Sequence, residues 1–473
     1  MKARPILAVW RAVPKRGAVA AVLASGQLFQ GLFGPPAAAA EERSSSAKLR
    51  VIIETDAGGD PDDEQSLVRF LLYANEWDVE GIIATRPETR RDNRNTQRTG
   101  LGIVRAQLEA YGQVWPNLNR HRPGYPTMPW LWQRTVAGYN DSPDGVNLIL
   151  EAVDRPDPRP VWYCNWGTDD DTTSSLKRAL DKVLAERGPT GYAAFKNKLR
   201  LSSDDKFGDH TRKLEPPWVL WVYPFYPNMD GGRWYHRFGP LTAKAGGFDL
   251  QRDLLSGHGP LGALYPTTRD IAQKEGDTYT FLYLIPTGMN DPNEPGWGSW
   301  AGRFGVREDF QPRNPSFFWA NQRDTWGGTT NRDNTLKRWA ADLQNDFRAR
   351  LDWCVKPFAE ANHPPLARVE GALRRTVVPS AIVTLSAAGS TDPDGQALSF
   401  RWEWYPEAGA CAGPVAIEHA DSPQASFVAP SVPTTQTVHI ILRVTDNGQP
   451  PLTRYQRVIV TVEPRQVTRS PAP

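Results

Sequence analysis

The strongest constraint on the fold is a run of apolar residues that ends in acidic residues and is followed by a helical pattern. LRVIIETD (49–56) has the composition of a parallel strand that is buried on both faces. Apolar residues then recur at helical spacing over 62–76, and WDVEGIIAT (77–85) is the next predicted strand. This βαβ unit predicts an α/β domain with a mostly parallel sheet flanked by helices.

The same alternation continues along the chain. Further helices are predicted over 91–112, 172–187 and 333–360, and further strands over 159–167, 197–203 and 216–225. Residues 229–328 are loop-rich. We therefore assign 48–360 to one α/β domain.

The composition changes after the α/β domain. Residues 361–371 have the composition of a linker, and 372–464 contain short alternating strands divided by Gly, Pro, Asp and Asn. This pattern predicts a small sandwich of the immunoglobulin or cadherin type, followed by a disordered tail over 465–473. Within it, DPDG is first a turn sequence, and Ca²⁺ binding at Asp392 and Asp394 is the alternative.

The N-terminus has the three parts of a signal peptide over residues 1–40. A basic start is followed by an apolar stretch and by four alanines, so we expect cleavage near Ala40. A cytosolic basic tail or an uncleaved anchor is the alternative. No later segment holds the ~20 apolar residues of a membrane span. We expect a mature protein without a membrane span that is secreted or periplasmic.

Composition argues against nucleic acid and points to carbohydrate. The net charge of +2 carries no sign bias of the kind that nucleic-acid-binding proteins show. Eighteen tryptophans with abundant Gly and Pro indicate ordered aromatic loops, which can face flat sugar rings. The glycine-flanked Trp297, Trp300 and Trp326 are the candidates for stacking on sugars, and loops pinned by buried rings are the alternative.

The three cysteines form neither a disulfide framework nor a metal-binding spacing. Cys164 lies in the apolar run VWYCNW, which predicts a buried structural thiol. One bridge among Cys164, Cys354 and Cys411 remains open at this point.

A cluster of acids follows the first predicted strand. Four aspartates lie within eight residues, beside a Gly-Gly pair at 58–59: Asp56, Asp60, Asp62 and Asp63. Ligands of α/β sheets bind at the carboxyl ends of the strands, and crowded carboxylates repel each other unless a cation joins them. Oxygen-only ligands favour Ca²⁺ over Zn²⁺. A capped helix with solvated acids is the alternative.

These residues resemble a known family. TDAGGDPDD is similar to the aspartate motif of nucleoside hydrolases. HGPLGALYP, EGDTYTFLYLI and GWGSWAGRFG extend the resemblance to secreted bacterial proteins described as cellulose-binding, with a nucleoside-hydrolase-like domain. The resemblance covers about 50–462 and therefore includes both predicted domains.

The resemblance implies roles for individual residues. Asp56 and Asp63 match carboxylates that hold Ca²⁺, and Asp277 in EGDTYTF looks like a distant ligand. Asp62 matches the general base that takes a proton from a Ca²⁺-bound water. The chain departs from the nucleoside hydrolases at Gly276, where they have a His, and by the lack of an Asn after the second strand.

The sequence therefore predicts a secreted glycan-active protein, namely a Ca²⁺-dependent hydrolase of glycosidic bonds with Asp62 as general base. A non-catalytic carbohydrate-binding protein that retains the aspartate site is the alternative. Further candidates for substrate contact are His258, His236 and Asp205, although a loop histidine or a solvated turn is the common role for such residues.

Overall fold

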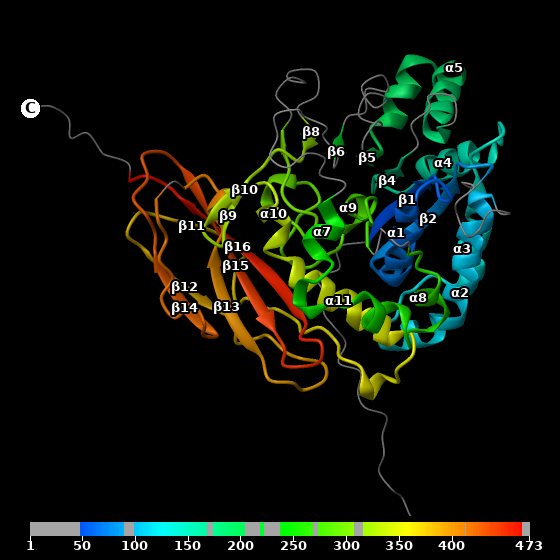
Figure 1. Cartoon of the computed structure of the whole chain (residues 1–473). Coiled ribbons are helices and arrows are strands. Elements are labelled where there is room, and N and C mark those ends of the chain that lie inside the picture. The colour runs from blue at the N-terminus through cyan, green and yellow to red at the C-terminus, as the bar shows by residue number, and fades with distance from the viewer. Residues whose placement is uncertain are drawn as a thin grey trace, which may run out of the picture. The chain divides into compact units, whose positions relative to one another are not determined.

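The computed structural model describes residues 48–88, 99–167, 174–203, 218–221, 237–267, 273–306, 316–411 and 413–465. These residues form an α/β region around an eight-stranded sheet, followed by a β-sandwich (Figure 1). The predicted fold class is therefore confirmed.

The central sheet has the order β3-β2-β1-β4-β5-β6-β8-β7. All neighbours in it are parallel except β7, which pairs antiparallel with β8. The bounds are β1 Leu49–Thr55, β2 Trp77–Ala84, β3 Thr135–Ala137, β4 Val161–Trp166, β5 Leu199–Ser203, β6 Val219–Trp221, β7 Gly305–Val306 and β8 Phe317–Trp319. Because β1 lies at the centre, the acids that follow it stand over the middle of the sheet.

Helices cover both faces of this sheet. They are α1 Pro61–Leu72, η1 Ala74–Glu76, α2 Gly100–His121, α3 Met128–Gln133, α4 Asp144–Asp154, α5 Ser175–Lys196, α7 Phe238–Thr242, η3 Ala245–Gly247, η4 Gln251–Leu255, α8 Gly259–Ala263, α9 Thr278–Leu282, η5 Pro295–Trp297, α10 Asn334–Lys337, α11 Ala340–Trp353 and η7 Phe358–Glu360. A hairpin of β9 Asp324–Trp326 and β10 Thr329–Asn331 lies between β8 and α10.

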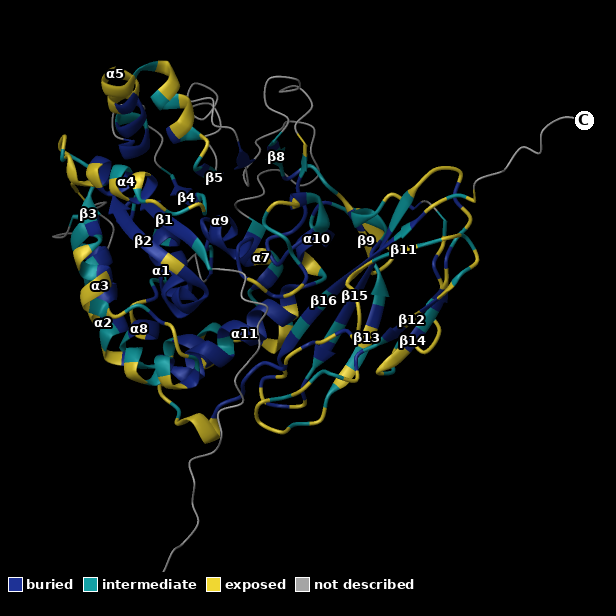
Figure 2. Ribbon diagram, turned by 180° about the vertical axis from the view of Figure 1, so that it is seen from behind, coloured by how far each residue is buried: buried dark blue, intermediate teal, exposed yellow. Residues whose placement is uncertain are grey.

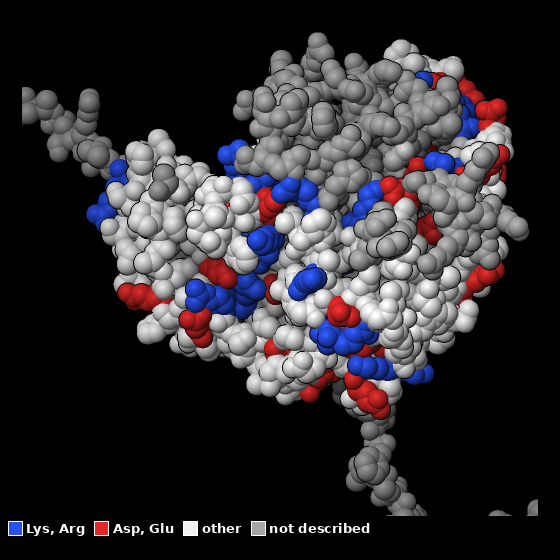
Figure 3. Space-filling view, viewed as in Figure 1, with Lys and Arg blue, Asp and Glu red and all other residues white. Residues whose placement is uncertain are grey.

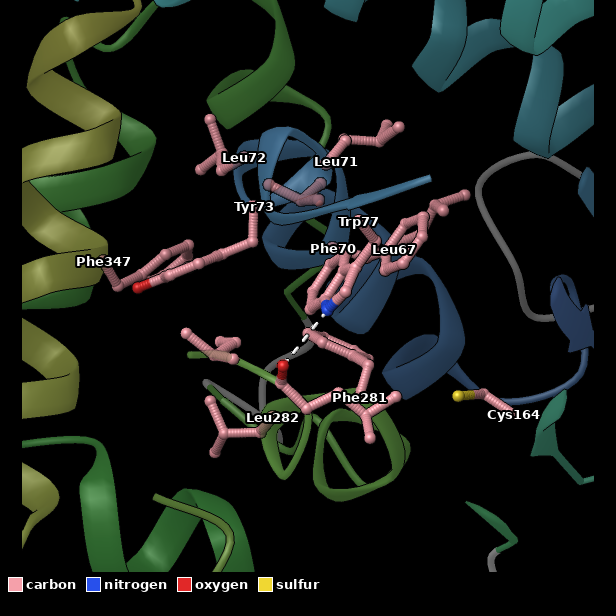
Figure 4. Packing of buried hydrophobic residues seen from close by; sticks show 14 of the residues in the cluster. Leu67, Phe70, Leu71, Leu72, Tyr73, Trp77, Cys164, Phe281, Leu282 and Phe347 are labelled. Atoms are coloured by element: carbon pink, nitrogen blue, oxygen red, sulfur yellow. Dashed lines mark hydrogen bonds between the residues drawn. The ribbon is translucent and has the colours of Figure 1, made fainter. Parts of the chain in front are cut away.

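Alternate residues of β1 pack into two separate hydrophobic cores. Ile53 joins a cluster with α1, α2 and α9, whereas Ile52 packs with α4 and α5. In the first cluster Phe70 stacks on Trp77, whose indole N–H donates to the Leu284 carbonyl at 3.3 Å (Figure 4). Burial on both faces explains the apolar run of β1, and the central strands of the sheet are dark blue in Figure 2.

The sandwich consists of a four-stranded and a two-stranded sheet. The first has the order β11-β16-β15-β13, and the second pairs β12 with β14. The bounds are β11 Arg374–Val377, β12 Ile382–Ser386, β13 Ser399–Trp404, η8 Pro406–Ala408, β14 Gln424–Val428, β15 Gln436–Thr445 and β16 Thr453–Val462. Trp402, Phe427 and Ile440 are among the buried residues between the sheets.

Several predicted elements differ in detail. The predicted helix over 333–360 is broken between α10 and α11, at the fully buried Trp339. The predicted helix over 172–187 continues to Lys196 past a kink at Gly188. The elements α3, β3, α4 and β11 had no sequence prediction.

The three cysteines are free and buried, so the bridge that the sequence left open does not form. No helix of the described residues has both the length and the apolar character that a bilayer crossing requires. Acidic and basic side chains alternate over the face seen in Figure 3, as the small net charge suggests.

Candidate functional site

Three buried carboxylates meet beyond the carboxyl end of β1. Asp62 and Asp63 belong to the first turn of α1, and Asp277 immediately precedes α9. Their exposed fractions are 0%, 3% and 1%. Each offers one oxygen, and these oxygens lie within 4.8 Å of one another. We call Asp62, Asp63 and Asp277 the aspartate triad.

Local sequence explains how α1 presents two of these acids. Pro61 occupies the first turn, where its missing N–H costs nothing. The chain reaches it through Gly58, which has a φ of 91°. A Cβ on Gly59 would lie 2.8 Å from Asp56 Oδ2, so a larger residue there would displace the Asp56 carboxylate. The Gly-Gly pair therefore allows the tight turn that brings the first turn of α1 back over β1.

The helix α1 also fixes the segment that carries Asp277. Gln65 Oε1 accepts hydrogen bonds from the backbone N–H groups of Lys274 at 2.8 Å and Glu275 at 3.0 Å. Arg69 forms a fully buried ion pair with Glu275, in which Nη2 lies 3.0 Å from Oε1. These contacts join residues more than 200 positions apart, and they bring Asp277 to the acids of α1.

Crowding disfavours the ionised form of Asp63. Burial raises the pKa of this carboxyl well above its usual value, and the nearby Asp277 and Asp56 raise it further. Thr55 Oγ1 donates a hydrogen bond to Asp63 Oδ1. The position needs either a proton or a cation to compensate the repulsion.

Two basic side chains reach this group. Lys274 pairs with Asp60, and its Nζ also lies 3.1 Å from Asp62 Oδ2. Arg86 Nη1 lies 3.4 Å from Asp56 Oδ2. Within the described residues, the five aspartates of this region thus face these two basic side chains, and negative charge is in excess.

The aspartate triad fits a hard divalent cation. Ca²⁺ takes oxygen ligands at about 2.3–2.6 Å, so two oxygens bound to one ion stand up to about 5 Å apart. The spacing within 4.8 Å meets this condition. The donors are carboxylates only, which favours Ca²⁺ over Zn²⁺.

The structure places the predicted acids in two groups. Asp62, expected to act beside the metal, stands among the three oxygens that can share one ion. Asp56 and Asp60, expected as ligands, are partly exposed and lie outside the aspartate triad, each beside a basic side chain. The predicted meeting of Asp277 with Asp63 is present.

The prediction for Trp300 is wrong. Its side chain has no exposed surface, and its indole N–H donates to the Tyr455 hydroxyl of the sandwich at 3.3 Å. Trp297 is partly buried under the guanidinium groups of Arg374 and Arg457, whose carbons lie 5.1 and 5.6 Å from the ring centre. Both rings pack against the sandwich and do not form an open sugar platform.

The other candidates are scattered. Trp326 is 41% exposed on the hairpin β9–β10. His258 Nε2 lies 3.2 Å from Asp352 Oδ1 of α11, which holds it by a carboxylate outside the triad. His236 and Asp205 lie outside the described residues.

The DPDG sequence acts as a turn. Asp392 Oδ1 accepts from the backbone N–H groups of Asp394 and Gln396, both at 2.9 Å. Asp394 accepts from the backbone N–H of His363 at 2.8 Å. Both carboxylates are thus used to shape the loop.

Sequence reasoning missed Lys274, Arg86 and Thr55. Thr55 and Lys274 flank the predicted acids, but adjacency alone does not tell which atoms they contact. Arg86 follows β2, in the region where the nucleoside hydrolases have their Asn. Its guanidinium group contacts Asp56 Oδ2.

Comparisons with known proteins agree with this architecture. The family model described as "Cellulose-binding Sde182, nucleoside hydrolase-like domain" matches residues 50–304. The model described as "Cellulose-binding protein Sde0182, C-terminal domain" matches residues 382–462. No curated protein matches the chain significantly.

One solved structure is similar over most of the chain. It is a nucleoside hydrolase-related hypothetical protein from Saccharophagus degradans, described as associated with carbohydrate metabolism. It is 33% identical with a TM-score of 0.69, over 88% of this chain and all of that one. Two others, the PKD domain of the KIAA 1837 protein and human CDH23 EC21-23, match 22% and 24% of this chain at 23% and 16% identity. They cover 93% and 35% of their own chains, and their TM-scores of 0.18 and 0.16 support no inference.

Proposed function

The chain belongs to the family of cellulose-binding proteins with an Sde182 nucleoside hydrolase-like domain, and we propose that it binds a cellulose-like glycan with the help of a divalent cation. The cation would be Ca²⁺, held by Asp62, Asp63 and Asp277. When bound, it would offer vacant coordination positions to the hydroxyl groups of a sugar.

The observation that carries this proposal is the buried aspartate triad. Three carboxylates within 4.8 Å cost folding free energy unless a cation or protons compensate them. A protein that only needed a stable α/β domain would be more stable if at least one of these three carboxylates were replaced by an uncharged side chain. Their presence at the carboxyl end of β1 is the feature of a ligand site.

Binding is favoured over catalysis by the surroundings of Asp62. A general base needs a carboxylate that can accept a proton in the reaction. Here Asp62 lies 3.1 Å from the ammonium group of Lys274, so its carboxylate is already engaged by a basic side chain. In addition, Gly276 stands where the nucleoside hydrolases have a histidine.

Hydrolysis of a glycosidic bond is the second candidate, and one observation favours it. Asp62 is retained and fully buried beside Asp63 and Asp277, as a base next to a metal site would be. In that case Asp62 would take the proton from the attacking water.

We also propose that the protein acts outside the cytoplasm. The support is the basic, apolar and small-residue order of residues 1–40, and a polymer such as cellulose is itself extracellular. Cell fractionation, with N-terminal sequencing of the exported chain, tests this; an intact N-terminus in the cytosol would contradict it.

The test compares the wild type with Asp277→Asn and Asp62→Asn. We would measure retention on insoluble cellulose and calorimetric binding of cello-oligosaccharides, in Ca²⁺ and in chelator, and we would analyse the sugars for cleavage products. Loss of the Ca²⁺-dependent binding in Asp277→Asn supports the proposal. Glycan binding that is unchanged by chelator and by both substitutions contradicts the proposal. Cleavage products that form with the wild type and not with Asp62→Asn favour the hydrolase.

A further inference from the structure

A second groove lies at the opposite end of the central sheet from the aspartate triad. Its volume is about 460 Å³, and it is lined by Lys48, by the start of β2, by residues 124–127, by Trp130 of α3 and by two arginines. β1 separates the two ends of the sheet, and its seven residues span roughly 23 Å. The groove is therefore distinct from the triad.

The wall of the groove contains an exposed aromatic ring in a fixed position. Trp130 is 43% exposed. Its indole N–H donates to the Val79 carbonyl at 3.4 Å, and the Arg134 guanidinium carbon lies 4.2 Å from the ring centre. The ring is thus anchored to β2 and covered on one side, while the remaining surface lines the groove (α3 beside β2 in Figure 2).

Charged groups of both signs surround this ring. Arg159 Nη1 lies 2.7 Å from Asp78 Oδ2, and Arg155 Nη1 lies 2.9 Å from Glu80 Oε1. The side chains of Asp78 and Arg155 are 46% and 36% exposed. Each arginine faces a carboxylate, whereas Lys48, which also lines the groove, donates to the Gly124 carbonyl at 3.2 Å. The groove therefore presents hydrogen-bond donors and acceptors with an excess of one positive charge.

We propose that this groove is a second glycan-binding site that takes neutral, hydroxyl-rich sugar chains independently of any cation. The indole surface contacts the apolar C–H groups of a sugar ring, and the paired acids and arginines bind its hydroxyls. The nature of the ligand rests on the proposed function, whereas the location does not. Because both arginines are already paired with carboxylates, a neutral glycan is favoured over an anionic ligand.

A larger groove in the sandwich is the weaker candidate. Its volume is about 620 Å³, and its lining, which includes Thr384, Ser386 and Gln424, is polar or aliphatic. His419 supplies the one ring among the residues that line it, and no Trp, Tyr or Phe is among them. It therefore lacks the large aromatic surface on which a sugar ring stacks best.

The test compares Trp130→Ala with Phe358→Ala in the full chain. Phe358 is the control, because it is an aromatic residue exposed to 40% that is not among the residues that line the groove. We expect Trp130→Ala to weaken the binding of cello-oligosaccharides and insoluble cellulose in chelator by about tenfold or more, and Phe358→Ala to leave it unchanged. Asp78→Asn should weaken it without removing a large side chain.

Thermal unfolding of each variant shows whether it folds, and Asp78→Asn keeps the test valid if Trp130→Ala does not. Equal binding by wild type, Trp130→Ala and Asp78→Asn would overturn the second site. Loss of binding only in Asp277→Asn would overturn it while supporting the triad. Loss only in the groove variants would support the second site and contradict a role of the triad in binding, and a wild type that binds no glycan would overturn both.

Discussion

Replacing Asp63 by asparagine is expected to stabilise the cation-free protein and to abolish its stabilisation by Ca²⁺. The amide oxygen of the new side chain would still accept the hydrogen bond of the Thr55 hydroxyl, so the substitution removes charge and little else. The fold should therefore respond mainly to the loss of one carboxylate from the aspartate triad.

The spacing of the oxygens gives the size of the effect. Two like unit charges 4.8 Å apart repel by about 3 kcal/mol at an effective dielectric constant of about 20. Lys274 and protonation offset part of this, so we expect a gain of about 1–3 kcal/mol in chelator, or about 2–5 °C in Tm. In the wild type, Ca²⁺ at 100 times its Kd should add about 2.7 kcal/mol, and the variant should lack this gain.

Thermal unfolding with and without Ca²⁺ measures both effects. Asp60→Asn is the matched control, because Asp60 precedes α1 without capping it and lies outside the triad. It should lower Tm slightly in chelator, through the loss of the Lys274 pair, and should keep the response to Ca²⁺. An Asp63→Asn variant that is less stable in chelator and still responds to Ca²⁺ would refute the reasoning.

Three further outcomes follow from the same contacts. In chelator, the difference in Tm between Asp63→Asn and the wild type should depend on pH, because burial raises the pKa of Asp63 above its usual 3.8. The variant should have no advantage below pH 3.8, and its advantage should grow as the pH rises through the folded-state pKa of Asp63. A difference in Tm that is the same at every pH would contradict this. Lys274→Gln should lower Tm in chelator but bind Ca²⁺ severalfold more tightly by calorimetry, because it removes a positive charge 3.1 Å from Asp62; weaker binding would show that Lys274 helps to build the cation site. Trp300→Ala should cost about 3–5 kcal/mol of unfolding free energy in denaturant titrations. Glycan affinity of the folded Trp300→Ala variant should stay unchanged, and a selective loss of affinity would restore Trp300 as a binding residue.

The layered fold was predictable because β1 is buried on both faces. That burial demands an apolar run, and the helical spacing after it identifies α1. The position of the acids followed from the rule that parallel strands end at the same edge. Short elements such as α3 and β3 contain too few residues to show a periodic spacing of apolar side chains, so the sequence did not predict them.

Apart from the meeting of Asp277 with Asp63, which the family resemblance implied, contacts between distant segments were not predictable. The pairing of Arg69 with Glu275 joins α1 to the segment before α9, and nothing in either segment alone reveals it. Trp300 shows the same limit: neighbouring glycines suggested an open ring, but the ring is fully buried and its N–H donates to Tyr455 of the sandwich. Lys274 was missed because its two acidic partners precede it by more than 200 residues.

The most direct test of the central claim is a calorimetric titration of Ca²⁺ into the metal-free wild type and into Asp277→Asn. Asp277 comes from a segment far from Asp62 and Asp63 in sequence, so its effect reports on the shared site. We predict one Ca²⁺ per chain in the aspartate triad of the wild type and at least a tenfold weaker association in the variant. Equal affinities, or no binding to the wild type, would contradict the account.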